Sequence, residues 1–156
     1  MRSNGNAAEG TSNASSNDKL AGQELYFPAG LLGFPSCHRY KLERFNSGAG
    51  DESPFLVLNS LDQDLSFPLV HPNSIALHYR FPVDVELLSA LAARAHSELV
   101  PLLIVTVRER LEDITLNLQG PLIVNPTTSL GLQLVIEEYP LRYPILNGTS
   151  PQKPPS

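Results

Sequence analysis

Few side chains of this 156-residue chain could support catalysis or metal binding. The 4 histidines, His38, His71, His78 and His96, have no Cys or His neighbour at the spacing of zinc ligands. The single cysteine, Cys37, precedes His38, but an activated thiol needs a spatial arrangement that adjacency does not supply. The chain also lacks a P-loop and a G-x-S-x-G motif. We therefore expect no metal, no cofactor and no enzymatic activity.

Carboxylates are the main candidates for binding. Acid–base catalysis needs a desolvated carboxylate, whereas aspartates in turns usually bond to local backbone. We therefore interpret three acidic spots as surface that faces a protein partner. They are Asp62 and Asp64 in a predicted turn, Glu137 and Glu138 at the end of the last long predicted strand, and Glu109, Glu112 and Asp113 in a loop between strands.

Composition limits the partners and the compartment. The 11 Lys and Arg against 16 Asp and Glu give a net charge of −5, which argues against direct nucleic-acid binding and suits a basic protein partner. No apolar run approaches the roughly 20 residues of a membrane span. The N-terminus lacks the pattern of a signal peptide. We expect a cytoplasmic protein without membrane contact.

The elements that must position these groups lie in one predicted domain, residues 23–145. Residues 1–22 and 146–156 are rich in Asn, Ser, Gly and Pro, so we expect a disordered leader and a disordered tail. Short apolar or alternating runs separated by turn residues predict strands at 40–45, 55–58, 65–70, 102–107, 114–119, 122–124 and 132–137. Their spacing is typical of a small antiparallel β-barrel or sandwich, hence a mainly β fold.

One segment has helical periodicity. Asp84 can cap a helix that runs to about Ala95, with an apolar stripe at Leu87, Leu88, Leu91, Ala92 and Ala95. A second special segment is the apolar loop, residues 27–34 (FPAGLLGF). Its two glycines and its proline predict a sharp turn between buried flanks.

Four segments, read in order, resemble landmarks of the FliW family of flagellar assembly factors. Residues 27–34 resemble its FP-x-GL-x-GF segment, and residues 54–67 (PFLVLNSLDQDLSF) resemble its F-x-x-L-x-S-x-x-D-x-x-L-x-F segment. Residues 114–125 (ITLNLQGPLIVN), which follow the strand at 104–107, are similar to its T-x-N-L-x-x-P-I-x-x-N core. Residues 139–145 (YPLRYPI) are similar to its closing Y-x-x-R-x-P-I.

The resemblance implies a small, barrel-like β domain that binds two proteins and catalyses nothing. One partner is flagellin, and the other is CsrA, a dimeric RNA-binding repressor of flagellin translation that the family antagonises allosterically. We expect CsrA contacts at Asp62, Asp64, Glu137 and Glu138. A predicted hairpin carrying Asn117, Leu118, Ile123 and Asn125 is expected to contact either partner, although both asparagines suit turns equally well.

The chain departs from the family at its start. Family members usually place a strand or two before the segment at 27–34, and here only residues 23–27 remain for a strand. This predicts either an open barrel edge or an edge supplied otherwise. An alternative function also stays open, since a small barrel can bind a small apolar ligand in its mouth.

Overall fold

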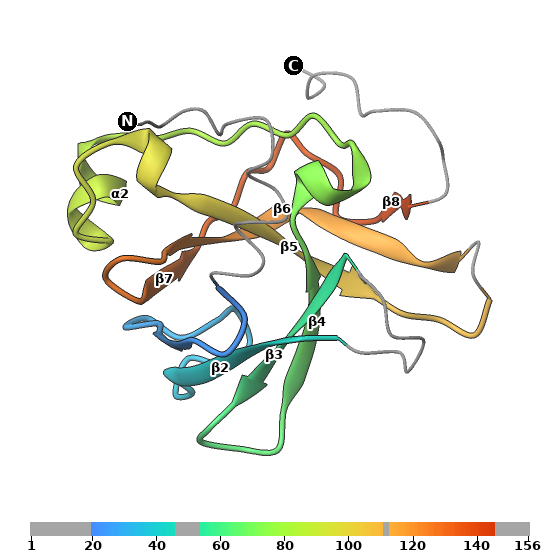
Figure 1. Cartoon of the computed structure of the whole chain (residues 1–156). Coiled ribbons are helices and arrows are strands. Elements are labelled where there is room, and N and C mark those ends of the chain that lie inside the picture. Colours follow the sequence, from blue (N-terminus) through green and yellow to red (C-terminus); the bar gives the residue numbers. More distant parts are fainter. Residues whose placement is uncertain (1–19, 46–53, 111–112, 146–156) are drawn as a thin grey trace, which may run out of the picture.

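The computed structural model describes residues 20–45, 54–110 and 113–145, and their strands close into a barrel (Figure 1). The strands are β1 (Glu24–Tyr26), β2 (Arg39–Arg44), β3 (Phe55–Ser60), β4 (Ser66–Val70), β5 (Val100–Thr106), β6 (Thr115–Asn125), β7 (Leu130–Gln133) and β8 (Tyr143–Pro144). They pair in the order β5-β4-β3-β2-β1-β7-β6-β8, and β5 also pairs with β6. The ring therefore runs from β1 to β7, and the predicted mainly β, barrel-like fold is confirmed.

The barrel closes through its shortest contact. β1 pairs with β2 along its whole length, antiparallel, but it meets β7 in parallel and only at Tyr26 and Leu130. The prediction of an antiparallel barrel is thus wrong at this one seam. For the start of the chain, the sequence predicted either an open barrel edge or an edge supplied otherwise. Neither describes the structure fully, because β1 supplies the edge strand but covers only the first part of β7.

The fold begins before the predicted boundary at residue 23. Leu20 is fully buried in the barrel, and the backbone N–H of Gly22 donates to the Leu42 carbonyl at 2.6 Å. These two residues fall within the predicted leader. Residues 1–19 of that leader, the predicted tail and the loop at 46–53 lie outside the described residues.

β6 is one long strand where the sequence predicted two strands around Gly120 and Pro121. The register moves from Asn117 to Leu122 along β6 while it moves only from Ile104 to Leu102 along β5. The extra β6 residues form a bulge, which lets the strand bend without ending. The predicted hairpin at residues 117–125 is therefore wrong.

The predicted amphipathic helix is shorter than expected. α2 (Val85–Ala90) begins where the Asp84 carboxylate accepts the Leu87 N–H at 2.9 Å, as predicted. It ends because Ala92 adopts a left-handed φ of 52°, and its N–H and that of Ala93 bond back to the Ser89 and Leu88 carbonyls. This Schellman geometry usually has glycine at the left-handed position, so no residue in the sequence marks the end of the helix here.

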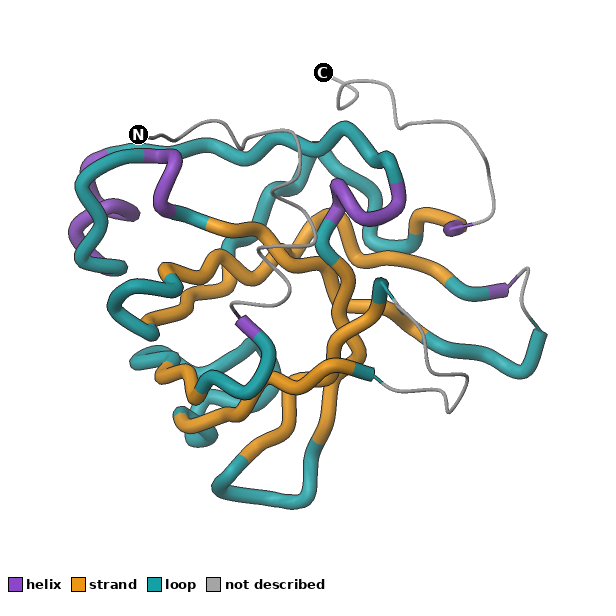
Figure 2. Tube along the Cα trace, in the orientation of Figure 1, coloured by secondary structure: helices purple, strands orange, loops and turns teal. Residues whose placement is uncertain are grey.

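Side chains fill the barrel and both of its outer flanks. Inside, Phe27, Tyr40 and Leu58 are fully buried in one cluster. Outside, α2 packs Leu87 and Leu91 onto β6 and β7, and Figure 2 shows the helical segments beside the strands. The segments η2 (Pro72–Ile75) and η3 (His96–Glu98) flank the start and end of the connection that carries α2. None of the helices in the described residues is long and apolar enough to cross a membrane.

Candidate protein-binding site

The acidic turn between β3 and β4 uses one of its two carboxylates internally. Asp62 accepts hydrogen bonds from the backbone N–H groups of Arg39 and His38 at 3.2 and 3.0 Å, and from the Arg39 guanidinium at 3.1 Å. The backbone N–H groups of Arg39 and His38, together with that guanidinium, hold the pKa of the Asp62 carboxyl below its usual value. Asp64 is exposed, and its side chain has no partner among the described residues. Asp62 therefore ties the turn to β2, and Asp64 is the carboxylate that a partner can reach.

The second acidic pair lies elsewhere. Glu137 and Glu138 are exposed in a turn that the Tyr139 N–H closes by donating to the Ile136 carbonyl at 3.1 Å. Figure 1 shows the β3–β4 turn at the bottom of the molecule, whereas the chain after β7 rises toward the top. The four predicted acidic contacts thus form two separate surfaces.

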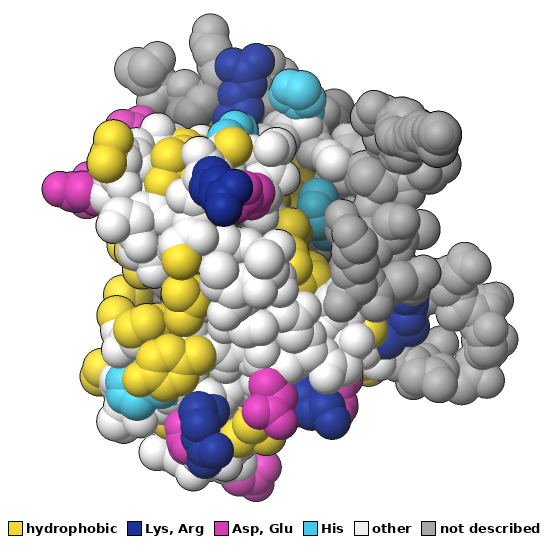
Figure 3. Space-filling model, turned by 60° about the vertical axis from the view of Figure 1, so that its left-hand side comes forward, with side chains coloured by type: hydrophobic (Ala, Val, Ile, Leu, Met, Phe, Trp, Pro, Cys, Tyr) yellow, Lys and Arg dark blue, Asp and Glu magenta, His cyan; other side chains and the backbone are white. Residues whose placement is uncertain are grey.

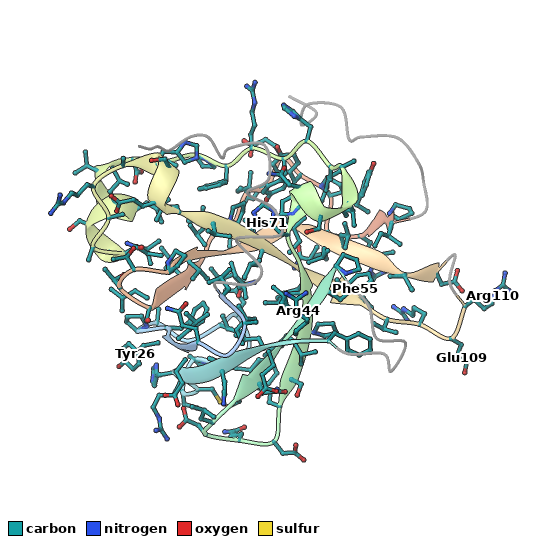
Figure 4. The ribbon with its side chains drawn as sticks, in the orientation of Figure 1. Tyr26, Arg44, Phe55, His71, Glu109 and Arg110 are labelled. Carbon is teal, nitrogen blue, oxygen red and sulfur yellow. The ribbon has the colours of Figure 1, made fainter. Side chains whose placement is uncertain are left out.

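The third acidic spot lies on a different loop. Glu109 and Arg110 lie at the outer tip of the β5–β6 loop, opposite Tyr26 in Figure 4. Arg110 forms an ion pair with Asp113 at 3.8 Å, and Glu112 lies outside the described residues. We find no role for this tip in joining the other two surfaces.

Of the predicted hairpin contacts, Asn117 organises the β6 bulge. Its side-chain oxygen accepts the N–H groups of Gln119 and Gly120 at 3.0 and 2.9 Å. Leu118 beside it is fully buried, and its carbonyl accepts the Tyr79 hydroxyl at 2.6 Å. These contacts stabilise the bulge and leave Leu118 no surface for a partner.

The other two hairpin residues anchor α2. Ile123 is fully buried beneath the helix. Asn125 is fully buried too, and its amide donates to the Leu91 carbonyl at 2.9 Å while its oxygen accepts the Thr127 N–H at 3.0 Å. Both residues hold the helix to the barrel, which explains their place in the sequence pattern without any partner contact.

An apolar groove lies where the apolar loop crosses β7. It has a volume of about 310 Å³ and is lined by Ala29, Gly30, Leu31, Leu32, Gly33, Pro35, Leu132 and Gln133. Figure 3, which brings the left side of Figure 1 forward, shows hydrophobic side chains gathered along one margin of that face. Of the lining side chains only Gln133 is polar, so the groove suits an uncharged apolar group.

Gln133 fixes the geometry of this groove. Its side-chain oxygen accepts the Leu32 N–H at 2.8 Å, and its side-chain nitrogen donates to the Gly120 carbonyl at 2.9 Å. One side chain thus joins the apolar loop to the β6 bulge. Gln133 was not among the predicted site residues, and its only signal in the sequence is a polar residue between two leucines of an apolar strand.

The remaining candidates for chemistry are the histidines and the cysteine. They contain no group of three His, Cys, Asp or Glu side chains placed to hold a metal ion. Cys37 is buried inside the barrel, and the ring of His38 bonds through Nδ1 to the Phe27 carbonyl at 3.0 Å. Burial lowers the pKa of His71 to about 4, which keeps that imidazole neutral.

Comparison with known proteins decides the family. A profile of the FliW protein family matches residues 8–145. The chain belongs to the FliW family. Flagellar assembly factor FliW of Natranaerobius thermophilus is 35% identical over 127 residues, covering 79% of this chain and 82% of its own. Flagellar assembly factor FliW of Geotalea uraniireducens is 35% identical over 135 residues, covering 85% of this chain and 79% of its own.

A solved structure agrees with the FliW assignment. A crystal structure of the flagellar assembly factor FliW superposes with a TM-score of 0.69 at 26% identity, covering 83% of this chain and 87% of that one. The family match also begins at residue 8, inside the predicted leader. The barrel fold and the sequence landmarks therefore both support the FliW assignment.

Proposed function

We propose that this protein is a flagellar assembly factor that binds flagellin and antagonises a CsrA-type translational repressor, without catalysing a reaction. The observation that carries the proposal is the FliW family match over the whole barrel. Two properties of the structure support a binding role. The described surface offers an uncharged apolar groove beside β7, and it offers free carboxylates at Asp64, Glu137 and Glu138.

The carboxylates and the groove suit different chemical properties of a partner. Exposed carboxylates on a chain of net charge −5 favour the approach of a basic RNA-binding protein. An apolar groove suits the hydrophobic terminal segments of flagellin before its export from the cytoplasm. We place the protein in that compartment for this reason.

The mechanism that we propose is partner switching. Binding of flagellin lowers the affinity for the repressor, and by linkage binding of the repressor lowers the affinity for flagellin to the same extent. Abundant flagellin releases the repressor, which silences flagellin synthesis. Export of flagellin frees the factor to capture the repressor again, so flagellin synthesis resumes.

Titration of the purified protein with each partner tests the proposal. We expect binding of flagellin and of the CsrA-type repressor from the same organism at micromolar concentration or below. Repressor binding should weaken as salt rises, because exposed charges are screened. Absence of both interactions contradicts the proposal, and saturable binding of a small apolar ligand in the groove then favours the ligand-carrier alternative.

Charge reversal separates the acidic groups. The double variant Asp62→Lys and Asp64→Lys tests the turn as a whole, while Asp64→Lys alone leaves the bonds of Asp62 intact. If Asp64→Lys leaves repressor affinity and its salt dependence unchanged, the turn is not a repressor contact. The proposed acidic contact with the repressor is then left to Glu137 and Glu138.

A further inference from the structure

The end of β7 and the residues that follow it present a backbone edge that the barrel does not pair. The Leu134 N–H donates to the Pro121 carbonyl at 3.0 Å, and the Ile136 N–H donates to the Gln119 carbonyl at 2.7 Å. Residues of an antiparallel ladder direct their N–H and C=O groups alternately toward and away from the neighbouring strand. Gln133 and Val135 therefore direct their backbone groups away from β6.

β1 does not reach this part of the edge. The Tyr26 N–H donates to the Ser129 carbonyl at 2.8 Å, which begins a parallel ladder beside β7. The next N–H on that side of β1 belongs to residue 28, which is proline and has none. The chain then turns away, with the Gly30 N–H bonded to the Phe27 carbonyl at 2.8 Å. Among the described residues, the backbone groups of Gln133 and Val135 have no backbone partner.

The surroundings of the edge are apolar along its length and acidic at one end. Leu32 is 61% exposed on the groove side, and Val135 is 54% exposed farther along. No ionisable side chain lines the groove. Glu137 and Glu138 follow directly, and both are exposed without a partner among the described residues.

We infer that residues 133–135 are a docking edge for an extended segment of a partner protein, uncharged and apolar in its middle and carrying Lys or Arg at the end near Glu137. Its backbone bonds to Gln133 and Val135, and one of its apolar side chains enters the groove, as in other strand additions. This choice of occupant follows from charge complementarity: the groove carries no charge, and the exposed Glu137 and Glu138 attract a basic residue. Symmetric pairing with the same edge of a second copy does not supply it, since residues 126–141 contain no Lys or Arg.

This inference rests on the proposed function for the existence of a partner, and it goes beyond it in naming the edge. The variant Val135→Pro removes the Val135 N–H, and no hydrogen bond of that N–H within the described residues is lost. The matched variant Val135→Ala shortens the side chain and keeps the N–H. We expect roughly tenfold weaker binding of one partner for Val135→Pro, and a change below about threefold for Val135→Ala.

Charge reversal tests the acidic end. Glu137→Lys with Glu138→Lys should weaken the same partner and reduce the salt dependence of its binding. Glu109→Lys is the control, because Glu109 is equally exposed but lies at the outer tip of the β5–β6 loop (Figure 4). The double variant changes two charges and the control only one. A loss of binding free energy for the double variant that is no more than twice that of the control would mean that only net charge matters, which contradicts the inference.

Amide hydrogen exchange of the unmodified protein tests the edge without any variant. On saturation with flagellin or with the repressor, exchange at Gln133 and Val135 should slow at least about tenfold. Binding that leaves both amides unprotected overturns the docking edge and leaves the proposed function standing. If neither partner binds, the proposed function fails and this inference fails with it.

Discussion

Replacing Asn125 by Ala tests how the helical flank is held to the barrel. The Asn125 side chain is fully buried, and its amide donates to the Leu91 carbonyl at 2.9 Å while its oxygen accepts the Thr127 N–H at 3.0 Å. Each such bond contributes about 1 kcal/mol net, and a partly buried Thr127 N–H left unpaired costs about 1 kcal/mol more. We expect the free energy of unfolding to fall by about 2–3 kcal/mol.

The assay is urea unfolding followed by circular dichroism, with thermal unfolding as a second measure. A loss of this size corresponds to a melting temperature lower by roughly 10 °C for a domain of this length. The slope of the urea transition should stay unchanged, because the fold exposes the same surface when it unfolds. A loss below about 0.5 kcal/mol would refute the reasoning that a buried polar anchor fixes α2.

A double-mutant cycle sharpens the test. The Thr128 hydroxyl also donates to the Leu91 carbonyl, at 2.9 Å, so each single variant leaves that carbonyl one partner. Asn125→Ala combined with Thr128→Val removes both donors. The combined loss should exceed the sum of the single losses by about 1 kcal/mol, because only the double variant leaves the carbonyl unpaired. Strict additivity contradicts the shared acceptor.

Three further predictions concern stability. Burial lowers the pKa of His71 from 6.5 to about 4, so the unfolded chain binds more protons between those pH values and stability falls as pH drops through that window. Between pH 7 and pH 4.5, the free energy of unfolding of His71→Asn should fall by about 2 kcal/mol less than that of the parent protein, as measured by urea titrations. Parallel pH profiles of the two proteins would contradict this. Tyr40→Phe should raise the unfolding free energy by about 1 kcal/mol, since the Tyr40 hydroxyl is buried without a partner among the described residues, whereas Tyr79→Phe should lower it by about as much by losing its bond to a carbonyl. Gly30→Ala should destabilise by more than Gly33→Ala, because both have positive φ but only at Gly30 does a Cβ meet backbone atoms, at 2.6 and 2.7 Å; equal melting temperatures would contradict that steric argument.

Local signals in the sequence predicted most strands correctly. β3 shows this: the apolar run at residues 55–58 predicted a buried strand, and the strand in the structure is Phe55–Ser60 with Leu56 and Leu58 fully buried. The helix start was also predictable, since Asp84 caps it directly. The apolar loop carries its turn in glycine, and both Gly30 and Gly33 have positive φ as predicted.

The errors arose where distant contacts override local chemistry. Gly120 and Pro121 predict a turn, yet the Asn117 side chain and Gln133 bond the chain into a bulge within one strand. Ala92 has no local reason for a left-handed conformation. The tertiary contact of Asn125 with the last turn of α2 lies 34 residues away in the chain, and no pattern within one segment reveals it.

The candidate site was predicted only in part. The sequence identified the carboxylates, but the hydrogen bonds of Asp62 arise only when β2 meets the β3–β4 turn. The sequence also indicated Leu118 and Ile123 as partner contacts, but both are buried in the core. An apolar residue in a strand pattern looks the same whether a partner or the core covers it. The groove and the unpaired edge of β7 depend on where β1 ends, which is a property of the closed barrel.

Competition between the two proposed partners tests the central claim most directly. A labelled CsrA-type repressor is bound to the protein, and flagellin is added while the bound fraction is followed by fluorescence anisotropy. We predict that flagellin releases the repressor, and that the repressor weakens flagellin binding by the same factor in the reverse experiment. Simultaneous binding of both partners with unchanged affinities would contradict partner switching.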